Sequence, residues 1–292
     1  MEPRQLYLEL LMRSLNGELS EPIIERKKLL AEPEPSEALP YGIELCRELL
    51  RQADHKFAEF LQPMGKSAEE FSGISPFKLY GYLNWMNPKG SPDTMCGPDN
   101  IMAVNNIITT ILKEKVRGDF IETGVWKGGM TVLMRGALKA HGITSRRVWV
   151  ADSFSGLPPA DPKVSLKDAI FYHLMAPINH LAVPLEEVKE LFERYWLLDN
   201  KVRFLEGWFC DTLPKAPIRH LALIRMDGDF YDSTMDTLRA LYHKLSPGGY
   251  LIVDDYGIPC GCREAVDEFR AEHNIREPMV NINSDSIYWR KK

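Results

Sequence analysis

The sequence predicts an α/β fold in which a mostly parallel β-sheet carries helices on both faces. Three observations support this prediction. From Val116 onward, short β-rich runs alternate with helical runs. Most of these short runs end at or next to an acidic residue. A final pair of short alternating runs fits a hairpin at the edge of the sheet.

The expected elements follow one another in a regular order. Five parallel strands are predicted at 119–122, 147–152, 202–206, 222–226 and 250–254. Helices are predicted between and after them at 128–141, 185–195, 234–245 and 261–273. Residues 279–290 supply the terminal hairpin, which completes a seven-stranded, Rossmann-like sheet.

The first hundred residues have a different pattern. Leucine-rich runs at 6–15 and 43–50 have helical periodicity, and a Pro- and Glu-rich stretch at 32–37 between them reads as a linker. We therefore predict a helical N-terminal extension, residues 1–100, that acts as a lid on a main domain at 101–292. Helices with apolar faces this small must pack on that domain or on a second subunit, so a homodimer is expected.

Composition limits the possible partners. The net charge of −5, with mixed acidic and basic residues, argues against nucleic acid and membrane surfaces and favours a small molecule. No apolar run reaches the roughly 18 residues of a membrane span, and the start of the chain does not resemble a signal peptide. A cytoplasmic protein is expected. The five cysteines are scattered; Cys260 and Cys262 read as free buried thiols rather than as half of a metal site.

A glycine turn follows the first predicted strand, within residues 120–129. Gly124 would permit close approach of the backbone to a ligand. The turn lacks the second glycine of dinucleotide-binding sites, because Trp126 stands in its place, and this argues against a pyrophosphate ligand. Glu122, just before the turn, suits an amine-bearing ligand instead.

Asp152 closes the second predicted strand. In this type of fold, an acid at that place typically accepts hydrogen bonds from both hydroxyls of a ribose. The alternative role, capping a following helix, is disfavoured because Gly156, Pro158 and Pro159 prevent immediate helix growth.

Three further aspartates follow two neighbouring strands. Asp227 ends one strand, and Asp254 and Asp255 end the next. Carboxylates this close repel one another unless one is protonated or a cation lies among them, and oxygen ligands favour Mg²⁺. Alternatively, these aspartates cap helices and form salt bridges.

Five motifs together resemble the macrocin O-methyltransferase family, whose members methylate sugar hydroxyls during antibiotic biosynthesis. The motifs lie at 122–129, 152–158, 207–214, 226–234 and 253–256. Their order and spacing cover roughly residues 94–273, and the leucine-rich start of the chain also resembles the family's first helix. The resemblance implies a class I methyltransferase fold that binds S-adenosylmethionine and Mg²⁺.

Carried over residue by residue, the resemblance assigns three sets of positions. Residues 122–126 would hold the methionine end of the cofactor, 152–156 its ribose and adenine, and Trp208 would form a wall for the adenine. The full set of implied cofactor-binding residues is Thr94, Met95, Glu122, Thr123, Gly124, Val125, Trp126, Asp152, Ser153, Phe154, Ser155, Gly156, Trp208, Met226 and Asp227. The implied metal ligands are Asp227, Asp254 and Asp255, and Asp229 matches the general base. The segment 96–99 departs from the family pattern.

The expected activity is therefore S-adenosylmethionine-dependent, Mg²⁺-assisted O-methylation of a hydroxyl, on a sugar, in a small glycosylated or polyhydroxylated natural product. His173 and His180 are rival bases if the segment that carries them closes over the site. Two alternative functions stay open: a catechol-type O-methyltransferase acting on a phenolic diol, and a catalytically silent relative that only binds the cofactor.

Overall fold

The computed structural model describes residues 2–16, 92–175 and 181–292. In this part of the chain, a seven-stranded sheet has the order β3-β2-β1-β4-β5-β7-β6. The strands are β1 Asp119–Thr123, β2 Val148–Asp152, β3 Val202–Glu206, β4 Leu221–Met226, β5 Leu245–Val253, β6 Val280–Asn281 and β7 Ile287–Arg290. Strands β1 to β5 are parallel, and β7 runs antiparallel to both of its neighbours. The predicted fold class and terminal hairpin are confirmed.

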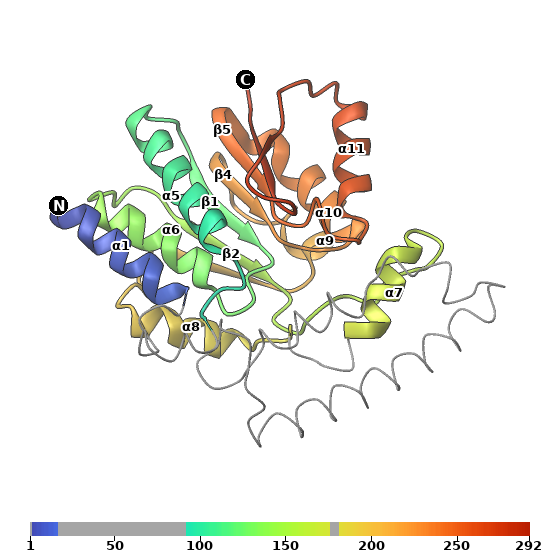
Figure 1. Ribbon diagram of the computed structural model, residues 1–292, viewed down its shortest axis with the longest axis horizontal. Coiled ribbons are helices and arrows are strands. Elements are labelled where there is room, and N and C mark those ends of the chain that lie inside the picture. The colour runs from blue at the N-terminus through green and yellow to red at the C-terminus, as the bar shows by residue number, and fades with distance from the viewer. Residues whose placement is uncertain (1, 17–91, 176–180) are drawn as a thin grey trace, which may run out of the picture.

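Helices cover both faces of the sheet (Figure 1). They are α1 Pro3–Leu15, α5 Pro98–Lys113, α6 Gly129–Ala140, α7 Leu166–Met175, α8 Leu185–Arg194, α9 Phe209–Thr212, α10 Tyr231–Leu241 and α11 Cys262–Glu272. Helices α1, α5, α6 and α8 share one apolar core with the sheet, and α10 and α11 share the other.

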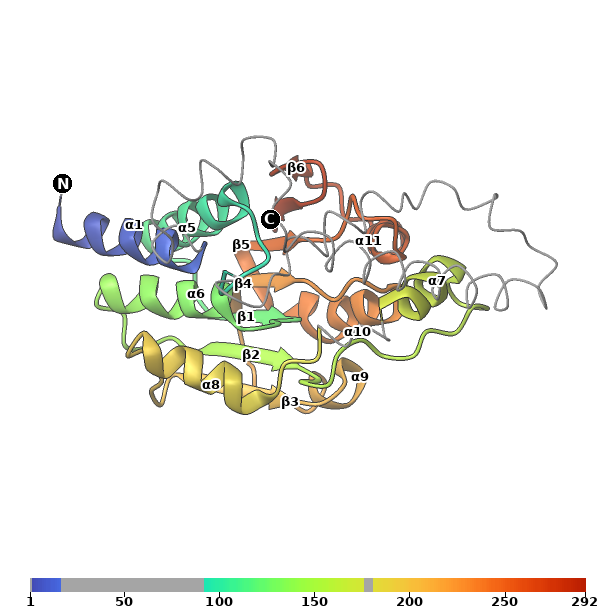
Figure 2. The same ribbon diagram turned by 60° about the horizontal axis from the view of Figure 1, so that its bottom comes forward.

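Successive side chains of β1 alternate between the two faces of the sheet and so pack into both cores. Phe120 packs with the α5 and α6 side and Ile121 with the α10 and α11 side, and both side chains are completely buried. Burial of such a side chain stabilises the fold by about 1.5–3 kcal/mol. The two cores therefore fix the strands, and their carboxyl ends point toward the side of the molecule where α7 lies (Figure 2).

Several strands and helices begin or end at other residues than the sequence predicts. Strand β1 runs one residue further, to Thr123, and β5 begins at Leu245 rather than at Tyr250. The added part of β5 contains Pro and Gly, and a register shift against β4 accommodates it. Helix α10 begins at Tyr231, nearly one turn earlier than predicted, and α7 was not predicted.

The described part of the N-terminal region packs on the main domain. Leu8, Leu11 and Leu15 of α1 are buried, and a Cβ at Gly136 of α6 would lie 2.4 Å from Leu11 Cδ2, so the two helices approach closely. The predicted helix at 43–50, the linker at 32–37 and His180 lie outside the described residues. Helix α5 spans residue 100, where we placed the domain boundary, and the division into two domains stays a prediction.

Cysteines and helix lengths add two observations. Cys96, Cys210, Cys260 and Cys262 are free thiols, as expected, whereas Cys46 lies outside the described residues. No helix in the described ranges is long and apolar enough to cross a membrane.

Candidate active site

A cavity of about 430 Å³ opens beyond the carboxyl ends of β1, β2 and β4. Nine of the predicted site residues line it: Met95, Gly124, Trp126, Asp152, Ser153, Gly156, Trp208, Asp227 and Asp229. The others do not belong to its lining: Thr94, Glu122, Thr123, Val125, Phe154, Ser155, Met226, Asp254 and Asp255. The structure therefore places part of the predicted set around one cavity, with the remainder behind it.

The turn after β1 lies directly against the turn after β4. Gly124 has a φ of +83°, and a Cβ there would lie 1.7 Å from the carbonyl oxygen of Asp227. Only glycine fits this position, because any side chain would collide with that backbone. Its N–H donates to the carbonyl oxygen of Ala151 at 2.9 Å, which ties the turn to β2 as well.

Asp152 braces this turn from the end of β2. Its Oδ2 accepts a hydrogen bond from the Val125 N–H at 2.7 Å, and its Oδ1 accepts one from the Phe154 N–H at 2.8 Å. Burial raises the pKa of Asp152, although these backbone N–H groups oppose the rise. Ser153 Oγ also donates to Oδ1, at 3.5 Å. The carboxylate lines the cavity, and ribose binding by Asp152 stays a prediction.

Glu122 lies deeper than the sequence suggested. It faces Arg225 of β4 in register, both side chains are 1% exposed, and Arg225 Nη1 donates to Glu122 Oε1 at 2.5 Å. Burial raises the pKa of Glu122 to about 8. By strand alternation Glu122 lies on the same face of β1 as Phe120, and it does not line the cavity. Among the described residues, its Oε2 has no hydrogen-bond partner.

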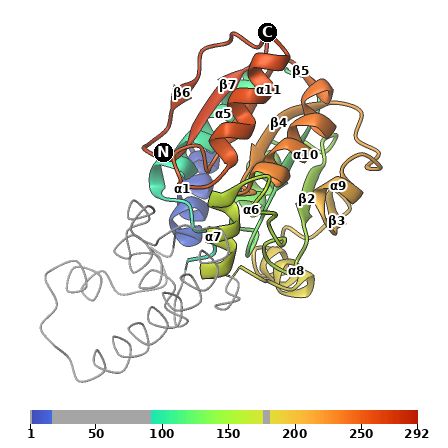
Figure 3. The same cartoon turned by 90° about the vertical axis from the view of Figure 1, so that its right-hand side faces the viewer.

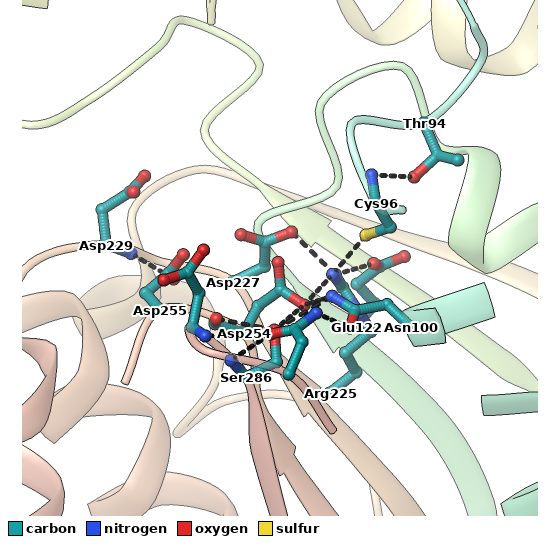
Figure 4. A network of polar contacts seen from close by, with 12 residues as sticks. Thr94, Cys96, Asn100, Glu122, Arg225, Asp227, Asp229, Asp254, Asp255 and Ser286 are labelled. Atoms are coloured by element: carbon teal, nitrogen blue, oxygen red, sulfur yellow. Dashed lines mark hydrogen bonds and ion pairs between the residues drawn. The ribbon is translucent and has the colours of Figure 1, made fainter. Parts of the chain in front are cut away.

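Arg225 is the centre of a buried polar network (Figure 4). Its Nη1 also binds Asp227 Oδ2 at 2.7 Å, and its Nη2 binds Asp254 Oδ1 and donates to Cys96 Sγ, both at 2.7 Å. A guanidinium therefore lies among the carboxylates where the sequence predicted a metal. The sequence signal for this role is one charged residue inside an otherwise apolar strand.

Two further residues complete the network around Asp254. Asn100, in the first turn of α5, donates to Asp254 Oδ1 at 2.9 Å and to Ser286 Oγ at the same distance. Ser286 Oγ donates to the carbonyl oxygen of Asp254, also at 2.9 Å. These residues come from distant parts of the sequence, so no local motif marked them.

The predicted metal ligands separate into two environments. Asp227 and Asp254, together with Cys96, place candidate ligand atoms within 4.8 Å of one another. Asp255 is not part of that group; it is 2% exposed, and its Oδ2 accepts the N–H of Asp229 at 2.9 Å. The oxygens of Asp227 and Asp254 fit a hard divalent cation, whereas a buried thiol does not.

The electrostatics of this rim also fit a cation. Burial, with repulsion from Asp227 and Asp254, raises the pKa of Asp229 to about 8. Burial likewise raises the pKa of Asp254 to about 6, even though Arg225 opposes the rise. One guanidinium thus leaves unfavourable carboxylate charge, which a divalent cation would offset.

The two candidate bases in the described residues lie in different places. Asp229 lines the cavity, with a left-handed φ of +55°. His173 lies on α7, is exposed and does not line the cavity. Asp229 is therefore the better placed of the two.

The strand order, with β7 antiparallel between β5 and the edge strand β6, and the glycine turn after β1 are those of a class I methyltransferase. Residues 83–291 match the macrocin O-methyltransferase (TylF) family. The chain belongs to this family and is an O-methyltransferase.

Similar proteins agree with this assignment. The chain is 48% identical over 197 residues to the 8-demethyl-8-(2,3-dimethoxy-alpha-L-rhamnosyl)-tetracenomycin-C 4'-O-methyltransferase of Streptomyces olivaceus, which covers 68% of this chain and 75% of that protein. It is 45% identical over 271 residues to the mycinamicin III 3''-O-methyltransferase of Micromonospora griseorubida, over 86% and 97% of the two chains. The solved structure of the O-methyltransferase NovP superimposes with a TM-score of 0.67 at 46% identity, over 70% of this chain and 84% of NovP.

Proposed function

We propose that this protein transfers a methyl group from S-adenosylmethionine to a sugar hydroxyl of a small glycosylated natural product, with help from Mg²⁺. The observation that carries this proposal is the convergence of the Gly124 turn, Asp152, Asp227 and Asp229 on one cavity. The names of the similar enzymes, which include a rhamnosyl-tetracenomycin and a mycinamicin O-methyltransferase, support the sugar acceptor.

The cofactor would lie along the cavity wall formed by β1 and β2. When bound, S-adenosylmethionine supplies an electrophilic methyl group on its sulfonium. The backbone of the Gly124 turn would contact its methionine part, Asp152 would accept hydrogen bonds from its ribose, and Trp208, which is 38% exposed, would cover its adenine. Glu122 would not contact the cofactor; its ion pair with Arg225 would instead fix the end of β1 and so the turn that follows it.

The acceptor would enter from the side of Asp227 and Asp229. Asp227 and Asp254 would hold Mg²⁺, with Asp255 next to Asp254 in the chain. When bound, the ion would lower the pKa of an adjacent sugar hydroxyl. Asp229 would accept the proton from that hydroxyl. Displacement at the methyl group needs the oxygen in line with the carbon and sulfur, so the rigid turns after β1 and β4 would contribute by alignment.

The charges of the cavity also restrict the acceptor. Its lining contains seven aspartates, and within the described residues it includes no lysine, arginine or histidine. A nucleotide-linked sugar would bring its diphosphate next to these carboxylates at a Coulombic cost. The cavity therefore favours an uncharged or cationic glycoside.

Methyl transfer from labelled S-adenosylmethionine tests the proposal. Two acceptors would be demethyldecarbamoylnovobiocin and mycinamicin III, which appear in the names of two similar O-methyltransferases. For the catechol alternative, the acceptor would be a simple catechol. We expect methylation of a glycoside only, and only with Mg²⁺. Preferred turnover of the catechol would replace the proposal with that alternative, and cofactor binding without turnover of any acceptor would favour the silent relative. Cytoplasmic location and a homodimer stay predictions.

A further inference from the structure

One buried carboxylate of the cavity lining joins three helices. Asp168, in the first turn of α7, is 2% exposed. Its Oδ2 accepts the N–H of Tyr231 at 2.7 Å, and its Oδ1 accepts the N–H of Gly261 at 2.6 Å. Tyr231 is the first residue of α10, and Gly261 is the N-cap of α11. Asp168 thus satisfies N-terminal donors of two helices from a third. Figure 3 shows α7 next to the ends of α10 and α11.

The surrounding packing leaves little freedom at this junction. A Cβ at Gly261 would lie 2.5 Å from Asp168 Oδ2 and 2.7 Å from the Tyr231 Cβ, so the backbone approaches the carboxylate directly. The Phe171 ring of α7 meets the Phe230 ring edge-on, with centroids 5.9 Å apart. A negative charge at two helix N-termini is also favoured by their dipoles.

The same junction controls the residues around Asp229. Asp229 has a left-handed backbone conformation, which costs free energy for a residue other than glycine. Its N–H is held by Asp255, and two residues later the N–H of Tyr231 is held by Asp168. The turn that carries Asp229 is therefore fixed from both sides, and the side chain lines the cavity.

We propose that Asp168 is a positioning residue that holds Asp229 at the cavity wall by tying α7 to the first residues of α10 and α11. The cavity is also lined by residues 157–161 and 164–165, which lie directly before α7 in the chain. The same carboxylate therefore sets the acceptor wall and the base relative to each other. This inference rests on the proposed function for the role of Asp229 as base.

Hydrogen exchange of the full chain tests the positioning without any acceptor. Asp168→Ala should accelerate exchange of the Asp229 and Tyr231 amides by about tenfold or more, and leave β1 and β2 unchanged. The Asp229 amide is decisive because its own acceptor, Asp255, is intact. Lys167 lies on the same turn of α7 and forms an exposed ion pair with Glu264 of α11. Lys167→Met removes this pair, is the matched control and should behave as wild type. Unchanged exchange at Asp229 would overturn the proposal.

Asp168→Asn is the milder variant in case Asp168→Ala does not fold. Its amide oxygen can accept one of the two N–H groups, whereas its NH₂ group opposes the other, so the exchange at Asp229 should rise less but still measurably.

Kinetics separate positioning from general damage. With whichever of demethyldecarbamoylnovobiocin and mycinamicin III is methylated, Asp168→Asn should lower kcat by about 10- to 100-fold, while the Kd for S-adenosylmethionine stays within about twofold. In an Asp229→Asn background the same change should cost nothing further, since both act on one step. An additive loss would overturn the proposal. If wild type methylates neither acceptor, the proposed function fails for these acceptors, and the exchange experiment still decides the role of Asp168.

Discussion

Glu122 and Arg225 face each other in register on β1 and β4, and Arg225 Nη1 donates to Glu122 Oε1 at 2.5 Å. The same guanidinium binds Asp227 and Asp254, both beyond the ends of neighbouring strands. The strand that leads into the glycine turn is thus joined to the acidic rim by one side chain. Its positive charge offsets part of the repulsion among these carboxylates.

Replacing Arg225 should therefore destabilise the fold. Arg225→Met leaves buried Glu122 and the aspartates without their cation, and we expect a loss of about 3–5 kcal/mol in the free energy of unfolding. Urea titration followed by circular dichroism measures it. Arg239→Met, an exposed arginine of α10, is the control and should change stability by less than about 0.5 kcal/mol. Equal stability of Arg225→Met and wild type would show that the network does not need the charge.

The contrast between Asp152 and Arg225 shows what the sequence could predict. Asp152 closes a short apolar run before a glycine- and proline-rich turn, so local pattern placed it correctly at a strand end. Arg225 and Glu122 are 103 positions apart, and their contact depends on the register of β1 against β4, which no local pattern specifies. The predicted β1 ends at Glu122, one residue too early, and strand ends are the least predictable feature. Asn100 and Asp168 were missed for the same reason, because their partners are distant in sequence.

Loss of Asp152 should weaken cofactor binding. Asp152→Ala removes a charged hydrogen-bond acceptor from the cavity, and we expect S-adenosylmethionine affinity to fall by about 1.5–3 kcal/mol in calorimetric titration. Because Asp152 also holds the N–H groups of Val125 and Phe154, Asp152→Asn is needed to separate ligand contact from bracing of the turn. Asp161→Ala, another aspartate of the cavity lining, serves as control. Undiminished affinity in both Asp152 variants would remove this residue from the site.

The pair of Arg135 on α6 and Asp199 after α8 gives a pH-dependent stability. Arg135 is 5% exposed and Asp199 36% exposed. Burial acts to raise the pKa of Asp199, but hydrogen bonds from Arg135 and the Lys201 N–H outweigh it, and the pKa is lowered. A lowered pKa in the folded state contributes stability above the unfolded value of about 3.8, which is lost as pH falls through the folded value.

Asp199→Asn should therefore lower Tm by a few degrees, at about 2–4 °C per kcal/mol. The difference from wild type should stay constant between pH 8 and about 5, measured by differential scanning fluorimetry. Lys189→Gln, which removes the exposed pair with Glu186, should shift Tm far less, because solvent screens that pair. A difference that shrinks steadily between pH 8 and 5 would be inconsistent with a lowered pKa.

Removal of divalent metal should abolish methyl transfer while cofactor binding persists. The reason is electrostatic: even with Arg225 in place, burial and mutual repulsion raise the pKa values of Asp229 and Asp254, and a hard cation at Asp227 and Asp254 would favour their ionised forms. EDTA should therefore stop turnover and Mg²⁺ should restore it. Asp254→Asn should lose Mg²⁺ activation, whereas Asp232→Asn, an aspartate of the cavity lining, should retain it.

Cys96→Ala sharpens the same test. Mg²⁺ prefers oxygen ligands, so a variant without the thiol should keep Mg²⁺ activation within about twofold of wild type. If Cys96 were a ligand, its loss would instead raise the Mg²⁺ concentration needed for half-maximal activity to the extent seen in Asp254→Asn. Methylation at the wild-type rate by EDTA-treated, metal-free protein would remove the metal from the mechanism, and with it the main reason for Asp229 to be ionised when the acceptor binds.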